Sequence, residues 1–282
     1  MPSLTDLKAE LEDIQTLKFI SSAFTEASSA KIKKIRAAFE TNTEFYQDIT
    51  KVYHIVQAAA EKLEAADKKK HEGEYREGTL YAAITSNQRF YGSLNVNIMR
   101  KFVKDAQTGN PVLLVVGATG RDYLSSIRFP KKYEVQLFEH DTPKKEEVMK
   151  FMEYVKPYKT VMLYYPHFKS LMSQDVGIMD IALREEHGEL DKDDEAQTLF
   201  EPEVSEMLNF FETSVRSVLF FRVMLEVDLA RTAARLMTMS AAEQNANELE
   251  KEKHSQLYKV TNSFLNARLM ETFSGMSKWK GK

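Results

Sequence analysis

The sequence predicts a mixed α/β fold in which a small sheet domain is inserted between two long terminal helices that form an antiparallel coiled coil. Most of the 10 glycines and 7 prolines fall between Gly73 and Pro202, so both ends of the chain are nearly free of helix breakers. Apolar residues in both ends recur at three- and four-residue intervals, as on one face of a helix. The middle of the chain instead alternates short apolar strands with helical patterns.

The first predicted helix extends from Ser3 to about Ala66, and its apolar residues follow a near-heptad spacing. The second extends from about Pro202 to Gly275, and no glycine or proline interrupts it before Gly275. A compact domain cannot contain two such rods, so each helix has to shield the apolar face of the other. The longer helix needs additional cover where the shorter one ends.

Five segments between these helices are predicted strands because β-branched and aromatic residues dominate them. They are Thr79–Thr85, Val112–Gly117, Tyr133–Phe138, Thr160–Tyr165 and Val176–Leu183. Helical patterns lie between them at about 95–108, 122–127 and 143–156. This alternation predicts a small Rossmann-like sheet with crossover helices. The charged runs Lys68–Lys70 and Glu185–Glu195 mark its edges, which gives predicted boundaries of 1–68, 75–195 and 200–278 for the three parts.

Composition excludes several classes of protein. The 39 basic and 42 acidic residues leave a net charge of -3, which does not suit a chain that coats nucleic acid. The absence of cysteine excludes disulfides, thiolate metal sites and cysteine nucleophiles. The first twenty residues carry charges every few positions, unlike a signal peptide, and no run of eighteen uncharged apolar residues occurs. We therefore expect no membrane span and no nucleic-acid partner.

Catalytic chemistry is also not indicated. The six histidines are scattered, and no two have the i, i+4 spacing that places two metal ligands on one helix face. Gly117 and Gly120 follow a predicted strand, but the full dinucleotide fingerprint and a phosphate loop with its lysine are missing. Turn geometry is the simpler explanation for this glycine pair. We expect no active site, no metal and no cofactor.

Several motifs, in this order and spacing, resemble the gamma subunits of F-type ATP synthases. Near the start, residues 14–34 read IQTLKFISSAFTEASSAKIKK, an amphipathic segment that ends in small residues and a basic cluster. In the middle, 117–123 read GATGRDY, and Phe168-Lys169-Ser170 follows. The most specific block is the pair of segments 233–239 (AARLMTM) and 245–249 (NANEL). The resemblance covers nearly the whole chain.

This resemblance implies a non-catalytic central rotor shaft. Its coiled coil would lie inside the hexamer of alpha and beta subunits, and its sheet domain would contact an epsilon-type subunit and the membrane ring. The shaft would couple rotation to ATP synthesis or hydrolysis in the hexamer and to proton transport through the membrane sector. The bacterial form would be a peripheral protein on the cytoplasmic side of the cell membrane.

The resemblance also implies partner contacts at two places on the helices. Leu265, Leu269 and Phe273 would form an apolar tip held in a sleeve of the hexamer, and the alternative is an ordinary intramolecular coiled-coil seam. A basic cluster would lie near acidic loops of the beta subunits, and the alternative is a solvated helix face. The cluster consists of Lys31, Lys33, Lys34 and Arg36.

One loop departs from the family pattern. Residues 86–95 read SNQRFYGSLN, so bulky Phe90 and Tyr91 stand where the family has small residues. We expect both rings to dock a partner adapted to them, and the alternative is that they fold inward and fill the core of the sheet domain. Near the tip, Thr261-Asn262 or Asn262-Ser263 replaces an arginine-glutamine stretch of the family. The altered loop and tip motivate a second hypothesis, a gamma-like rotor of a specialised rotary ATPase with a non-standard membrane or cytoskeletal partner. A third is an independent coiled-coil scaffold with a nucleotide-binding insert.

Overall fold

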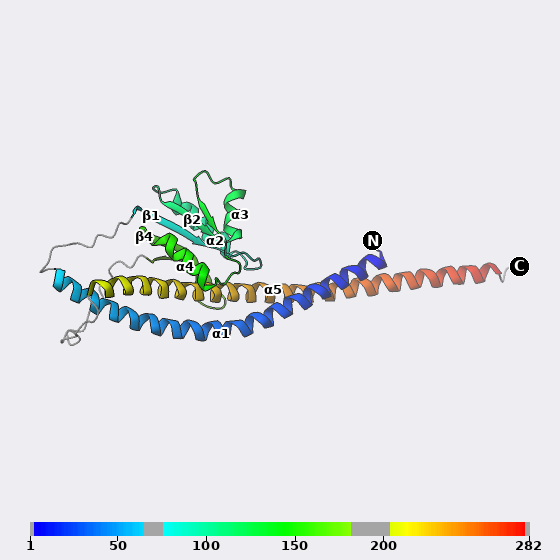
Figure 1. The fold of residues 1–282 in the computed structure, drawn as a ribbon. Helices are drawn as coiled ribbons and strands as arrows, with labels where there is room; N and C mark the ends of the chain where they lie inside the picture. Colours follow the sequence, from blue (N-terminus) through cyan, green and yellow to red (C-terminus); the bar gives the residue numbers. More distant parts are fainter. Residues whose placement is uncertain (1–2, 65–75, 182–203, 280–282) are drawn as a thin grey trace. The chain divides into compact units, whose positions relative to one another are not determined.

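The computed structural model describes residues 3–64, 76–181 and 204–279 and consists of two long helices and a five-stranded sheet domain (Figure 1). Its elements in chain order are α1 (Leu4–Glu64), β1 (Arg76–Ile84), α2 (Leu94–Ala106), β2 (Val112–Val116), α3 (Ala118–Ser126), β3 (Glu134–Gln136), α4 (Lys145–Val155), β4 (Tyr158–Phe168), β5 (Gln174–Asp180) and α5 (Val204–Trp279). The predicted mixed α/β architecture is confirmed. The charged runs Lys68–Lys70 and Glu185–Glu195 lie outside the described residues, and the three-part boundaries stay a prediction.

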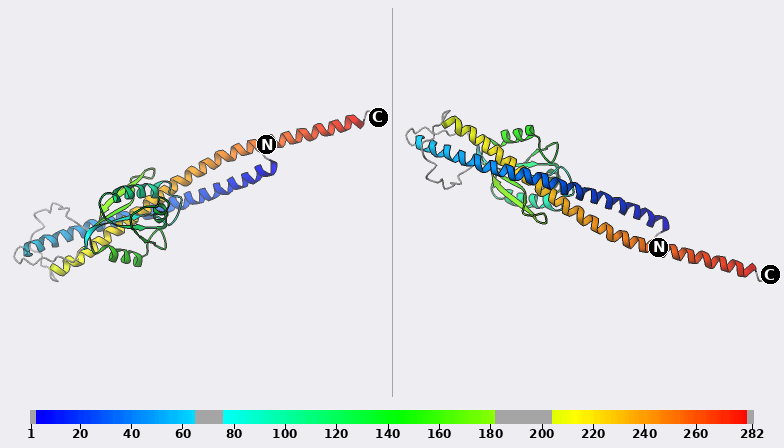
Figure 2. Two further views of the ribbon diagram at one scale, coloured as in Figure 1. Left: turned by 90° about the horizontal axis from the view of Figure 1, so that it is seen from above. Right: turned by 90° about the horizontal axis from the view of Figure 1, so that it is seen from below.

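The chain divides into two compact units, Met1–Ser29 with Arg235–Lys282 and Ala30–Ala234. In both units α1 and α5 pack in antiparallel directions, as the ribbons in Figures 1 and 2 also show. In the first unit, Lys18 pairs with Glu250 at 3.0 Å and Glu10 pairs with Lys253. In the second, the guanidinium of Arg222 lies over the ring of Tyr46, 5.5 Å from its centroid. Residue numbers rise along α1 as they fall along α5, which confirms the predicted antiparallel coiled coil.

The sheet has the strand order β3-β2-β1-β4-β5. β1 pairs in parallel with β2 and β4, and β2 pairs in parallel with β3. These four strands are joined by α2, α3 and α4, as crossover connections require. β5 instead runs antiparallel to β4, because the connection between them is a tight turn in which Ser170 and Ser173 exchange backbone hydrogen bonds.

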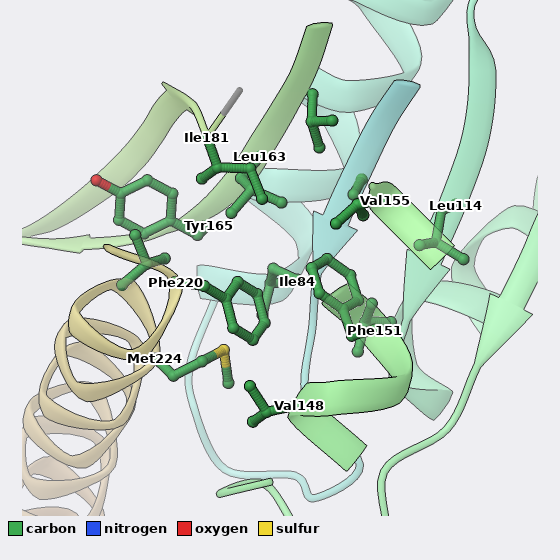
Figure 3. Packing of buried hydrophobic residues seen from close by; sticks show 14 of the residues in the cluster. Ile84, Leu114, Val148, Phe151, Val155, Leu163, Tyr165, Ile181, Phe220 and Met224 are labelled. Atoms are coloured by element: carbon green, nitrogen blue, oxygen red, sulfur yellow. The ribbon is translucent and has the colours of Figure 1, made fainter. Parts of the chain in front are cut away.

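Helices cover both faces of the sheet in the second unit. Side chains alternate along β1, so Leu80, Ala82 and Ile84 face one side and Ala83 faces the other. On the first side they pack against α4 and α5, where the rings of Phe151 and Phe220 meet (Figure 3). On the second side Ala83 joins apolar residues of α2 and α3. The core therefore attaches α5 directly to the sheet.

Two helix ends differ from the sequence-based expectation. α3 begins at Ala118, four residues before the predicted start at Asp122, because the glycine turn itself forms the first turn of the helix. α5 continues through Gly275 to Trp279. A Cβ added at Gly275 would meet nothing within 4 Å, so this glycine serves no close packing contact.

Candidate functional site

The end of α5 presents an unbroken exposed segment. Every residue from Ser263 to Met276 is exposed, whereas Leu7 and Leu11 near the start of α1 are buried in the same unit. Leu265, Leu269 and Phe273 follow one another at four-residue spacing, so they share one face of the helix, and they are 49% to 65% exposed. These three side chains are therefore not packed in an intramolecular coiled-coil seam, which was the alternative considered above. This apolar tip is a surface of the kind that a partner covers.

The predicted basic cluster divides into two parts. Lys31 donates to Asp228 of α5 at 2.6 Å, so its ammonium group holds α1 to α5 within the second unit. Arg36 pairs with Glu40 one turn along α1, and both side chains are mostly exposed. Exposed pairs of this kind contribute little stability. Lys33 and Lys34 are exposed on α1. Lys33, Lys34 and Arg36 therefore present positive charge to a partner more openly than Lys31 does.

The structure separates the two aromatic residues of the loop after β1. Phe90 is 59% exposed and has a φ of 70°, a left-handed conformation that is unfavourable for a bulky residue. Tyr91 is only 6% exposed and packs in the core beside α2. Its hydroxyl donates to the carboxylate of Asp141 at 2.6 Å. The expectation that Tyr91 docks a partner is therefore corrected: its ring folds inward because its hydroxyl finds a polar acceptor there.

The carboxyl edge of the sheet is where folds of this class bind nucleotides, because a helix N-terminus offers backbone N–H groups to phosphate. In this chain, residues that follow β1 accept hydrogen bonds from the N–H groups at the start of α3, where a phosphate would bind. The N–H of Ala118 donates to the Asn87 side chain at 2.9 Å, and that of Gly120 donates to the Thr85 hydroxyl at 3.0 Å. The N–H of Thr119 donates to the carbonyl of Ser86 at 3.0 Å. The first three donors of α3 are therefore already satisfied.

Gly117 and Gly120 allow the start of α3 to lie close to Thr85 at the end of β1. Gly117 has a φ of 102°, and a Cβ there would approach the Thr85 carbonyl oxygen to 2.3 Å. A Cβ at Gly120 would approach the Thr85 hydroxyl to 2.7 Å. Both positions need glycine so that α3 can rest on the end of β1. The turn-geometry explanation of the glycine pair accounts for both residues.

A groove of about 580 Å³ in the described part of the chain lies between α1 and α5 and has no titratable side chain among its lining residues, which are Ala37, Ala38, Thr41, Asn42, Phe45, Phe221 and Leu225. No cluster of three or more histidine or acidic residues in the described ranges could hold a metal ion. None of the described helices combines the length and apolar character needed to cross a bilayer.

The sequence analysis did not identify a set of buried polar residues on α5. Glu226, Asp228 and Arg231 are buried on α5 within an otherwise apolar stretch. His167 of β4 contacts the Glu226 carboxylate, and the Phe168 N–H donates to it at 3.3 Å. Burial, and next the carboxylate of Glu226, raise the pKa of Tyr165 to about 12. Charges inside an apolar helix segment are a signal that polar partners must lie opposite them.

Comparison with known proteins gives consistent results. A family model described as ATP synthase matches residues 3–277. The chain is similar to the ATP synthase gamma chain of Clostridium novyi, with 24% identity over 96% of both chains. It is also similar to the gamma chain of Trichlorobacter lovleyi, with 22% identity over the full length of both. Among solved structures, a central stalk chain of the Tetrahymena thermophila mitochondrial ATP synthase matches with a TM-score of 0.55 and 22% identity, covering 79% of this chain and 99% of that one. This likeness shows the shared fold.

Proposed function

Because the chain belongs to the family of ATP synthase gamma chains, we propose that it acts as a rotor shaft whose exposed apolar tip turns against the hexamer of alpha and beta subunits. A gamma chain is the central-stalk subunit of the F1 sector and is not catalytic, since the catalytic sites lie on the beta subunits. The F1 sector is attached to the membrane. We further infer that the protein lies on the cytoplasmic side of the cell membrane, as in the bacterial form of the complex.

One observation carries this proposal. The coiled coil is antiparallel, and the end of α5 continues as an exposed helix with Leu265, Leu269 and Phe273 on one face. We infer that a partner protein buries this apolar face, because the burial of exposed apolar surface is favourable. A shaft transmits a conformational signal by offering different contacts to each surrounding subunit, and this is the requirement for coupling between sites.

Other exposed residues supply candidate contacts of the same shaft. Lys33, Lys34 and Arg36 present positive charge that suits acidic loops of the beta subunits. Phe90 presents an aromatic ring at the carboxyl edge of the sheet, where it suits an apolar pocket on a neighbouring stalk subunit. Lys31, engaged with Asp228, contributes through the coiled coil itself.

Truncation tests the tip. We expect that deleting the chain after Phe264 weakens assembly and torque while slow ATP hydrolysis by the assembled complex persists, because the chemistry belongs to the hexamer. The substitution Glu271→Ser, at an exposed polar position of the same segment, is the matched control. It should change neither the assembly nor the torque of the complex. Complete loss of hydrolysis from an intact truncated complex would contradict the division of roles.

Native purification separates this function from the specialised rotary ATPase. The subunits that copurify with the tagged chain are identified by mass spectrometry. Alpha, beta and epsilon-type subunits together with a proton-conducting ring are the expected result. Recovery of alpha and beta subunits with a different membrane or cytoskeletal partner would favour the second hypothesis. Recovery of the chain alone, with saturable binding of labelled nucleotide, would favour the independent scaffold.

A further inference from the structure

Two kinds of contact attach α5 to the sheet domain within the second unit. The first is apolar, where Phe220, Val223, Met224 and Val227 of α5 pack on the sheet and α4. Apolar packing is non-directional, so it resists separation of two surfaces more strongly than a slide of one along the other. The second is a set of hydrogen bonds and ion pairs, whose distances and angles are restrictive. Both kinds oppose a slide of α5 along the sheet domain, and the second adds restrictive distances and angles to the interdigitation of the apolar side chains.

These polar contacts meet at the segment that follows β3. The carboxylate of Asp141 accepts from the Asn87 N–H at 2.7 Å and from the Tyr91 hydroxyl at 2.6 Å. The carbonyl oxygen of the same residue accepts from Arg231 of α5 at 2.9 Å. Asp141 thus contacts the loop after β1 through its side chain and α5 through its backbone.

The next residue extends the contacts to both long helices. Thr142 donates its hydroxyl to Asp228 of α5 at 3.3 Å. The other carboxylate oxygen of Asp228 accepts from Lys31 of α1 at 2.6 Å. We refer to these residues as the Asp141 network, which consists of Lys31, Asn87, Tyr91, Asp141, Thr142, Asp228 and Arg231. It is continuous from α1 through α5 to the edge of the sheet.

A buried charge makes this network resistant to displacement. Arg231 is only 2% exposed. Burial lowers its pKa, and the nearby carboxylates of Asp141 and Asp228 oppose that shift. Sliding α5 past the segment after β3 would part the guanidinium from its acceptor, and a buried charge without a partner is strongly unfavourable. The energy of the contact therefore rises steeply with displacement.

We propose that Asp141 is a positioning residue of the rotor, which fixes the register of α5 against the sheet domain so that torque passes between them without slip. The inference rests on the proposed function, because register under load matters only in a shaft that turns. The inference predicts that weakening the Asp141 network makes the attachment of α5 to the sheet domain more compliant, while the hexamer continues to hydrolyse ATP.

The test measures compliance in the assembled complex. The chain has no cysteine, so Met172→Cys, at a position 81% exposed in the turn between β4 and β5, gives a single attachment point for a bead on the sheet domain. In this background we compare Asp141→Asn, Tyr91→Phe and the control Asp122→Asn. Asp122 lies on α3, is paired with Arg121, is mostly exposed and lies outside the network. The readouts are the rate of ATP hydrolysis and the angular variance of the bead during catalytic dwells.

We expect hydrolysis to stay near the unsubstituted rate in all variants, and the angular variance to rise by about twofold in Asp141→Asn. The neutral amide weakens the bonds from Asn87 and Tyr91, which hold in place the segment whose backbone carbonyl accepts from Arg231. Tyr91→Phe should give a smaller rise because it removes one hydroxyl and keeps the buried ring. Unchanged variance in both variants would overturn the inference even if they melt at lower temperature. If Asp141→Asn does not assemble, Tyr91→Phe decides alone. A complex that hydrolyses ATP without turning the bead, before any network substitution, would refute the proposed function instead.

Discussion

The ring of Phe151 in α4 stacks on the ring of Phe220 in α5, with centroids 4.4 Å apart and an interplanar angle of 18° (Figure 3). Both side chains are fully buried. Replacing Phe220 with alanine should lower the free energy of unfolding by about 3–5 kcal/mol, because it leaves a cavity under the sheet. Phe221 is the adjacent residue but is 47% exposed, so Phe221→Ala should cost about 1 kcal/mol or less. Chemical denaturation measures both, and equal effects would contradict the packing described.

The two aromatic residues after β1 should respond oppositely to substitution. Tyr91→Ala removes a buried ring and should cost about 3 kcal/mol or more of unfolding free energy in the isolated chain. Phe90→Ala should leave that stability nearly unchanged and weaken assembly with the stalk subunit that the ring contacts. Phe90→Gly should be more stable than Phe90→Ala by about 1 kcal/mol, since glycine adopts the positive φ without strain. Normal assembly of both Phe90 variants would refute the proposed contact.

The apolar tip should make the isolated chain prone to association. Replacing Leu265, Leu269 and Phe273 with serine removes exposed apolar surface, so it should reduce hydrophobic-dye binding and light scattering without lowering the melting temperature. As a matched control, Leu7→Ser should lower the melting temperature markedly, because Leu7 is fully buried between the helices of the same unit. A triple variant that melts much earlier than the natural chain would show that these residues are packed after all.

The stability of the first unit should depend on pH through Glu250. Hydrogen bonds from Lys18, and next from Gln15, hold the pKa of this carboxyl below its usual range. A lowered pKa means that the folded state favours the carboxylate, so the contribution is present above the ordinary glutamate value and is lost as the pH falls through the folded value. Glu250→Gln should therefore be less stable than the natural chain at neutral pH, and the difference should vanish in acid. A constant difference across thermal melts from neutral to acidic pH would exclude this linkage.

The sequence predicted the elements of the fold well because their signals are local. Strand-forming residues cluster at 112–116 and 160–165, and the seams of α1 and α5 repeat at helical spacing, so each element could be placed from its own residues. The antiparallel direction of β5 was not predicted, because it depends on the short turn at Ser170 rather than on the composition of the strand. The early start of α3 likewise depends on Thr85 and Asn87, which lie about thirty residues earlier in the chain.

The candidate surfaces were predictable only in part. The exposure of Leu265 and Phe273 follows from the unequal lengths of the two helices, which the sequence displays. The inward position of Tyr91 does not, because it requires Asp141, fifty residues away, to lie beside the ring. Phe90 and Tyr91 have similar size and adjacent positions, so no local pattern separates them. Pairings between distant side chains are a property of the assembled fold.

The way in which α3 is capped also affects how the rotor responds to the state of the cell. A ligand that binds only the folded state stabilises it by an amount that grows with ligand concentration, so a nucleotide site in this domain would tie its rigidity to the prevailing ratio of ATP to ADP. Asn87, Ser86 and Thr85 instead occupy the donors at the start of α3. Melting temperature should therefore not vary with adenine nucleotide concentration through this helix end. Capping from within the chain thus makes the stability contributed by this helix end the same in an energy-rich cell and in a starved one.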